Sequence, residues 1–193
     1  GYNVGYWHWE MPYFPEVFES HFNLLDEIWV PSSFTAQSIG KKSLLPLQVI
    51  PYPIDIPKKI PHLEYIPFRF PSGSFVLLTA FDFMSSVERK NPVAVIEAFS
   101  ESIRHVPNLH LAIKTVNHDG FSNASNELRM ALSKIHPDHY TIIDQTLSRN
   151  ELISLFSQSN AFISLHRAEG FGMMMAEAMT LGLPVIATAW SAN

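Results

Sequence analysis

The sequence predicts an α/β protein built around a mostly parallel sheet. After residue 74, short apolar runs alternate with segments of helical spacing, and the apolar runs contain few polar positions. Strands that alternate with helices in this way pair in parallel through right-handed crossovers. Seven of the 14 prolines lie between residues 46 and 71, where helix is therefore disfavoured. This proline cluster separates the alternation from the first fifty residues and predicts a linker.

The individual elements follow from local signals. Residues 75–81 form a continuous apolar run, which is typical of a strand covered on both faces. Asn91 can cap the next helix, and Pro92 suits its first position. Ser148 and Glu151 have the spacing of a capping box, which predicts the start of a later helix. The remaining expected elements are strand 109–114, helix 128–135, strand 140–143, strand 161–165, helix 171–181 and strand 184–188.

The loops after the predicted strands are the expected place for a functional site. Ligands of parallel α/β sheets bind at the carboxyl ends of the strands. Charged and polar side chains in these loops are therefore better candidates for a ligand-binding site than the same residue types elsewhere. The loops are residues 82–90, 115–120, 144–148 and 165–172.

The first fifty residues have a different character, because aromatic side chains crowd between Trp7 and Trp29. A short helix over residues 32–40 is expected between strands around Ile28 and Val49. We interpret this segment as the closing part of a domain whose beginning is absent. The chain starts without methionine and without a basic-then-apolar signal pattern, so we expect a fragment without a secretion signal.

Composition argues against several functional classes. The 13 basic and 18 acidic residues give a net charge of −5, which argues against a nucleic-acid-binding protein. The sequence has no cysteine, which excludes a disulfide scaffold, a cysteine nucleophile and a thiolate metal site. The apolar stretch 171–190 has the length of a membrane span, but Gly182 and Pro184 interrupt it. We interpret it as a buried helix followed by a buried strand and expect no transmembrane segment.

The segment His166–Glu177 is the strongest candidate for a functional site. It follows the end of a predicted strand and continues into a predicted helix. Gly170 and Gly172 leave the first turn of that helix without large side chains. Its amide N–H groups and the positive end of its dipole are therefore expected to face an anion.

Glu169 and Glu177 lie eight positions apart in this segment, which corresponds to about 12 Å along a helix axis. This separation is too large for both carboxylates to act on one bond, but it suits contacts with the two ends of a long ligand. The alternative is two surface glutamates beside methionines that fill the core. The spacing alone leaves both interpretations open.

Two common nucleotide-binding motifs are absent from the sequence. A nicotinamide-dependent oxidoreductase would carry Gly-x-Gly-x-x-Gly after its first strand, but residues 81–86 contain no glycine. A P-loop hydrolase requires Gly-Lys-Ser or Gly-Lys-Thr, and neither occurs. Both classes are therefore disfavoured.

Seven residues separate Glu169 from Glu177, and the motif continues with Ala178-Met179, Gly182 and Pro184-Val185-Ile186. This pattern resembles the nucleotide-sugar site of the group 1 glycosyltransferases of the GT-B fold. Other segments are similar to one bacterial subgroup of that family, namely Gly5-Tyr6-Trp7 with Trp9-Glu10, Asp26–Ser32 and Arg89-Lys90-Asn91-Pro92. Several motifs in the family's order argue against a chance match.

The resemblance implies a GT-B architecture with a Rossmann-like, doubly wound donor domain. Residues 1–50 would be the end of an incomplete N-terminal acceptor-side domain, and residues 51–73 a proline-rich linker. Residues 74–193 would be the C-terminal nucleotide-sugar-binding domain, truncated at its C-terminus.

The resemblance also implies roles for particular residues. Glu169 would contact the donor sugar and is the predicted catalytic residue, and Glu177 would hold the ribose hydroxyls. Arg89 and Lys90 would hold the diphosphate, which suits a planar fork of donors beside a compact charge. The other predicted donor-binding residues, all beside Glu169 in the same segment, are His166, Gly170, Phe171 and Gly172. For His166, a donor contact and a bond to a loop carbonyl stay equally open.

The implied reaction moves a sugar from a nucleotide-sugar donor to a sugar or glycolipid acceptor, with retention at the anomeric carbon. It would serve glycan or polysaccharide biosynthesis and require no metal and no cofactor. In agreement, the sequence has no Asp-x-Asp pair, and its nine histidines form no metal-binding pattern. The expected location is the cytoplasm, and peripheral association with the inner face of the membrane stays open. No nucleic acid is expected as a partner.

An alternative function is a GT-B-like protein that binds a nucleotide without transferring sugar. For the chain by itself we expect weak donor binding and no transfer, because most of the acceptor-side domain would be absent. Binding of nucleoside diphosphates and nucleotide sugars would separate these possibilities.

Overall fold

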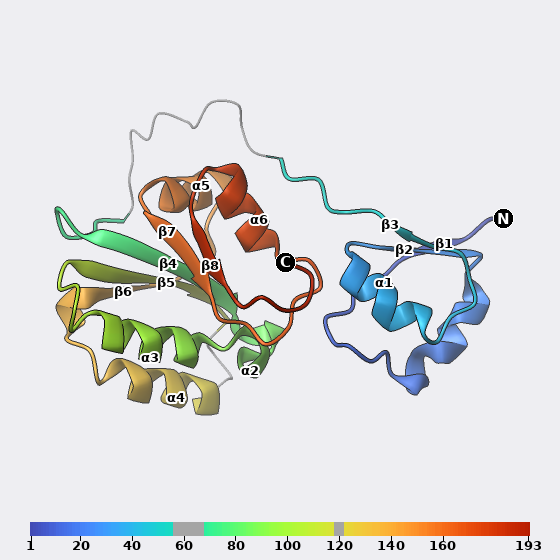
Figure 1. Ribbon diagram of the computed structural model, residues 1–193, viewed down its shortest axis with the longest axis horizontal. Helices are drawn as coiled ribbons and strands as arrows, with labels where there is room; N and C mark the ends of the chain where they lie inside the picture. The colour runs from blue at the N-terminus through green and yellow to red at the C-terminus, as the bar shows by residue number, and fades with distance from the viewer. Residues whose placement is uncertain (56–67, 118–121) are drawn as a thin grey trace. The chain divides into compact units, whose positions relative to one another are not determined.

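The computed structural model describes residues 1–55, 68–117 and 122–193 and divides into two compact units (Figure 1). The first unit contains Gly1–Ile54, Ala168–Met173 and Ala189–Asn193, and the second contains Asp55–Arg167 and Met174–Thr188. Residues 56–67 of the predicted linker and residues 118–120 of one predicted loop lie outside the described residues. The predicted domain boundaries stay predictions.

The first unit holds a three-stranded parallel sheet in the order β1-β2-β3. Helix α1 (Ser33–Gly40) connects β2 to β3, as predicted, and the side chain of Ser32 accepts a hydrogen bond from the Thr35 amide at its start. Strand β1 and a 3₁₀ helix over Glu16–Leu24 were not predicted. The three strands are β1 (Val4–Tyr6), β2 (Glu27–Val30) and β3 (Leu47–Val49).

Aromatic residues of the first unit pack against its core. Trp7 stacks against Phe14 and Phe22, with ring centroids 5.7 Å and 5.3 Å apart. Trp9 packs edge-on against Phe14, and its indole N–H donates to the carbonyl oxygen of Tyr13 at 2.8 Å. Trp7, Trp9 and Phe22 are therefore partly buried and pack against a core of Phe14, Ile28, Val30 and Ile39.

The second unit contains a five-stranded sheet in which all pairs are parallel, in agreement with the predicted fold class. Each predicted strand of the alternation is present, with small differences at the ends. The strand order is β6-β5-β4-β7-β8. The strands are β4 (Phe75–Asp82), β5 (Leu109–Val116), β6 (Tyr140–Asp144), β7 (Ala161–Ser164) and β8 (Val185–Ala187).

Helices cover both faces of this sheet. Figure 1 shows α3 (Pro92–Ser102) and α4 (Ser122–Leu132) on one face, and α5 (Arg149–Ser157) and α6 (Met173–Thr180) on the other. Leu111 and Ile113 of β5 point into the core on the α3–α4 side, whereas Ala112 between them points into the core on the α5–α6 side. This alternation is expected of a strand buried on both faces. Among the described residues, no helix combines the length and the apolar character needed to span a bilayer.

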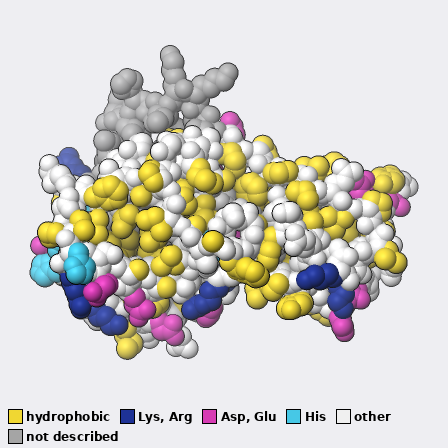
Figure 2. Space-filling model, viewed as in Figure 1, with side chains coloured by type: hydrophobic (Ala, Val, Ile, Leu, Met, Phe, Trp, Pro, Cys, Tyr) yellow, Lys and Arg dark blue, Asp and Glu magenta, His cyan; other side chains and the backbone are white. Residues whose placement is uncertain are grey.

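The outer surface of α3 and α4 is charged with both signs. Figure 2 shows basic and acidic side chains mixed on this side of the second unit. Two of the ion pairs join Arg104 to Glu101 at 3.0 Å and Lys134 to Glu97 at 3.8 Å. Such a mixture is typical of a solvated helix surface.

Three helix starts show how well local signals predicted the structure. The capping box is confirmed: the Glu151 amide donates to Ser148 Oγ at 3.3 Å, and the Ser148 amide donates to Glu151 Oε2 at 2.7 Å. Asn91 and Pro92 occupy the predicted cap and first positions of α3, but the Asn91 side chain makes no capping hydrogen bond, because its amide group donates to the carbonyl oxygen of Leu165 at 2.8 Å. Helix α6 starts at Met173 rather than at residue 171, because Gly172 has a φ of 81° and interrupts helical geometry.

Candidate functional site

A cavity of about 340 Å³ lies at the carboxyl edge of the sheet in the second unit, where the sequence predicts the site. Strands β4 and β5 and the starts of α5 and α6 contribute to its lining. Its charged lining residues are Asp82, Lys90 and Lys114. A larger hollow of about 810 Å³ lies near the amino ends of β4, β5 and β6, the edge where ligands of parallel α/β sheets do not normally bind.

Arg89 and Lys90 form the last turn of a short helix, α2 (Val87–Lys90). The sequence predicted a loop over residues 82–90, but the structure has a 3₁₀ helix at Phe83–Ser85 followed by α2. Asn91 then adopts a left-handed conformation with φ of 54° and ends α2 before α3 begins. The two predicted cations therefore sit on an ordered turn at the carboxyl edge.

The segment after β7 is hydrogen-bonded to α2, which carries Arg89 and Lys90. The backbone amide of Arg167 donates to the carbonyl oxygen of Arg89 at 2.8 Å, and the guanidinium of Arg167 donates to the carbonyl oxygen of Glu88. His166 directly precedes Arg167 and is only 1% exposed, with its Nδ1 3.0 Å from Ser164 Oγ. The structure thus joins the segment of His166 to the segment of Arg89 and Lys90, which are far apart in the sequence.

Glu177 lies inside α6 and is 8% exposed. Arg149 Nη1 donates to Glu177 Oε1 at 2.6 Å. The alternative of a surface glutamate on the polar side of a helix therefore does not describe Glu177. A buried ion pair adds little net stability, because the desolvation of its charges offsets their attraction. Stability alone therefore does not account for Glu177, which stays a candidate for ligand binding.

Glu169 belongs to the first unit and is also 8% exposed, so it is not a surface glutamate either. Its backbone amide donates to Ser191 Oγ at 2.9 Å. The next residue, Gly170, accepts a hydrogen bond from Thr35 Oγ1 at 3.3 Å through its carbonyl oxygen. These contacts fix the backbone of the segment that carries the predicted catalytic residue.

Gly170 and Gly172 precede the first turn of α6 and do not lie in it. They were expected to open the first turn of the helix toward an anion, but that turn begins only at Met173. A Cβ at Gly170 would lie 3.1 Å from the carbonyl oxygen of Trp9, so this glycine allows a close backbone approach. The ring of Phe171 packs edge-on against Tyr52 at 5.2 Å. The estimate of 12 Å between Glu169 and Glu177 assumed continuous helix and does not apply.

Lys114 is a cation that sequence reasoning missed. It lies near the carboxyl end of β5, is 9% exposed and lines the same cavity as Lys90. Its ammonium group donates to the carbonyl oxygen of Thr115 at 3.0 Å. Burial lowers the pKa of Lys114, and the carboxylates of Asp144 and Asp82 partly oppose this shift. The available signal was a lysine in a mostly apolar strand, which is unusual for a position between two helical layers.

We expect Lys114→Met to raise the free energy of unfolding by about 1 kcal/mol at pH 7, because it removes a desolvated charge. The pKa of Lys114 is lower in the folded than in the unfolded state, so the unfolded state holds more protons between these two pKa values. The stability of the wild type should therefore rise with pH in that window, and the variant should lack this rise. Urea unfolding at pH 7 and at successively higher pH measures both effects.

Lys134→Met, on an exposed lysine of the same unit, is the control and should leave the pH dependence unchanged. A Lys114→Met protein that is less stable at pH 7 and keeps the full rise with pH would contradict the argument.

A doubly covered parallel sheet with cations and a buried carboxylate near its carboxyl edge is typical of α/β proteins that bind anionic ligands. The model of the family Glycosyl transferases group 1 matches residues 83–193, which is more than half of the sequence. The chain belongs to this family. A search of curated proteins finds no match.

Solved structures of glycosyltransferases share the fold. A glycosyltransferase from Rickettsia africae matches with a TM-score of 0.75 and 17% identity, covering 98% of this chain and 52% of the other. A UDP-forming α,α-trehalose-phosphate synthase from Burkholderia xenovorans gives 0.70 and 15%, covering 97% and 54%. The pneumococcal O-GlcNAc transferase GtfA, in complex with UDP and GlcNAc, gives 0.65 and 18%, covering 96% and 37%.

These similarities confirm the predicted fold class, a mixed α/β architecture with parallel sheets shared with GT-B glycosyltransferases. At such low identities they establish the fold alone. The chain spans between about a third and about a half of the length of these proteins.

Proposed function

We propose that the chain binds a nucleotide sugar and belongs to a glycosyltransferase that retains the configuration of the anomeric carbon. The observation that carries this proposal is the cavity at the carboxyl edge of the second unit, in which Lys90 and Lys114 face a common space. Two cations are suited to a diphosphate, since phosphate oxygens accept charge-assisted hydrogen bonds from ammonium groups. The family to which the chain belongs supports the same ligand class.

The proposed contacts follow from the chemistry of each side chain. Arg89 and Lys90 would hold the diphosphate, with Lys114 as an additional cation. Glu177 would accept hydrogen bonds from the ribose hydroxyls, which a carboxylate can do through either oxygen. Glu169 would contact the transferred sugar and act as the catalytic residue.

The remaining predicted donor-binding residues support the backbone of the site in this proposal. His166 is held by its contact with Ser164, so its ring has a fixed orientation at the carboxyl edge. Gly170 and Gly172 shape the segment that carries Glu169, and Phe171 anchors it through Tyr52.

The transfer reaction is proposed for the whole protein, with a sugar or glycolipid acceptor in glycan or polysaccharide biosynthesis. It would proceed without a metal, the charge of the diphosphate being balanced by side-chain cations. The task that we assign to the present chain is donor binding without transfer. Transfer needs both reactants to be positioned together, and the chain spans only part of the length of its structural neighbours.

Isothermal titration of the chain with UDP, GDP, ADP and CDP, in the presence of EDTA, tests the binding proposal. UDP is the first probe because the pneumococcal GtfA structure contains it. We expect one nucleoside diphosphate to bind more tightly than its nucleoside, and the matching nucleotide sugar to bind as well. Equal affinity for nucleoside and nucleoside diphosphate would refute the anion site, and loss of binding in EDTA would refute metal independence.

A further inference from the structure

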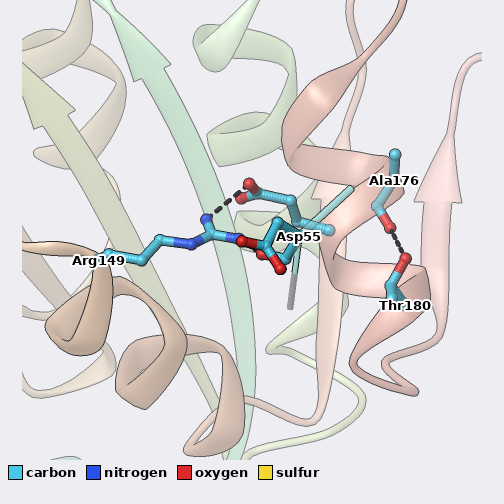
Figure 3. Close-up of polar contacts among 5 residues, drawn as sticks. Asp55, Arg149, Ala176 and Thr180 are labelled. Atoms are coloured by element: carbon cyan, nitrogen blue, oxygen red, sulfur yellow. Dashed lines mark hydrogen bonds and ion pairs between the residues drawn. The ribbon is translucent and has the colours of Figure 1, made fainter. Parts of the chain in front are cut away.

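Arg149 bonds to two residues of the second unit that are distant from it in the sequence, Glu177 and Asp55. It is the first residue of α5, and its guanidinium reaches Glu177 in α6. The same guanidinium donates through Nη2 to the carbonyl oxygen of Asp55 at 2.7 Å. Figure 3 shows the Arg149 side chain extending from the start of α5 toward Asp55. One planar fork of donors therefore serves two acceptors.

The two partners differ in burial. The side chain of Glu177 is 10% exposed, whereas that of Arg149 is 41% exposed. A carboxylate in such a place is destabilised unless a cation or strong donors compensate its lost hydration. Arg149 supplies this compensation from the solvent side. Nearby, the hydroxyl of Thr180 donates to the carbonyl oxygen of Ala176 within α6 at 2.7 Å, so this polar group of the helix is satisfied locally (Figure 3).

The start of α5 gives Arg149 a fixed base. The capping box of Ser148 and Glu151 sets the first turn of the helix, and Arg149 lies inside it. The bond to Asp55 then restrains the far end of the side chain. The Arg149 side chain is thus restrained at its backbone and at its guanidinium. Because the donors of a guanidinium lie in a rigid plane, Nη1 then meets Glu177 in one orientation.

We infer that Arg149 is a positioning residue that holds Oε1 of Glu177 and directs Oε2 toward the ribose of the ligand. Arg149 therefore sets the preference of the site for ribose over 2′-deoxyribose. This inference rests on the proposed function, since it takes Glu177 as the ribose contact. Arg149 itself does not touch the ligand in this assignment.

The test compares the nucleoside diphosphate that binds most tightly with its 2′-deoxy counterpart, for example UDP and 2′-deoxy-UDP. The wild type should prefer the ribonucleotide by about 10-fold, the lower end expected for a hydrogen bond to a charged group. Arg149→Met keeps the length of the side chain and removes the charge. It should weaken ribonucleotide binding by about 5-fold and leave the affinity for the deoxynucleotide nearly unchanged.

Two further variants distinguish positioning from general damage. Arg149→Lys keeps a cation without the fork and should retain part of the preference, which guards against a folding defect in the Met variant. In a Glu177→Gln background, Arg149→Met should have little further effect on the preference, because the two residues act as one unit. Arg129→Met, on the surface-exposed side of α4, is the matched control and should bind like the wild type.

Each outcome bears on one of the two proposals. If the wild type binds no nucleoside diphosphate, the proposed function fails and the inference fails with it. If the wild type prefers the ribonucleotide but Arg149→Met and Arg149→Lys keep that preference, only the positioning inference fails. An equal loss for both nucleotides, with nucleoside binding unchanged, would show that Arg149 contacts phosphate and would also overturn it.

Discussion

Replacing Arg89 or Lys90 by alanine should weaken binding of a nucleoside diphosphate by about 10- to 150-fold. Each substitution removes a charge-assisted interaction with phosphate, worth about 1.5–3 kcal/mol. The structure places both residues in the last turn of α2, at the edge where the cavity opens. Isothermal titration with the nucleoside diphosphate and with the corresponding nucleoside measures the effect.

The nucleoside is the internal control, because it has no phosphate to lose. Its affinity should be nearly the same for the wild type and for both variants. Arg104→Ala provides a second control, since Arg104 is an exposed cation that pairs with Glu101 at 3.0 Å. Equal losses for nucleoside and nucleoside diphosphate would contradict the assignment of Arg89 and Lys90 to the diphosphate.

Replacing Glu177 by alanine should weaken the nucleoside diphosphate and the nucleotide sugar alike, by about 10-fold or more. The reason is that the ribose contact is the same in both ligands. Glu169→Ala should leave the affinity for the nucleoside diphosphate nearly unchanged, because its proposed partner is the sugar. In the complete protein it should lower kcat, since a contact that matters mainly in the transition state affects turnover more than product binding.

Thermal melts must accompany these titrations, because both glutamates are buried. Glu101→Ala, at an exposed position on α3, controls for the loss of a carboxylate elsewhere. The opposite pattern, with Glu169→Ala abolishing nucleoside diphosphate binding and Glu177→Ala leaving it intact, would refute the assignment of the two carboxylates.

The parallel sheet of the second unit could be predicted because each of its strands is a local, apolar pattern. The continuous run at residues 75–81 is buried on both faces as β4, and the Ser148–Glu151 capping box starts α5 as expected. Such signals act over a few residues and need no knowledge of distant neighbours. Arg89, Lys90 and Glu177 were assigned to the donor site through the family resemblance, and these assignments stay predictions.

Local patterns were less reliable where tertiary contacts compete with them. Asn91 has the side chain of a helix cap, yet it bonds to the carbonyl oxygen of Leu165, a residue that the sheet brings close. Gly170 resembles an opening for an anion, but it meets the backbone of Trp9. The capping preference of Asn91 is worth only about 1 kcal/mol, so a long-range contact can outweigh it.

The sequence by itself determined the α/β class, the alternation of strands and helices, and the family resemblance of the segment around Glu169 and Glu177. Only the tertiary structure revealed that Lys114 lines the cavity beside Lys90, and that Arg149 holds Glu177. The physical reason is that desolvation and ion pairing depend on which side chains meet in space, and Arg149 and Glu177 are separated by 28 positions. Their encounter follows from α5 and α6 packing on the same face of the sheet.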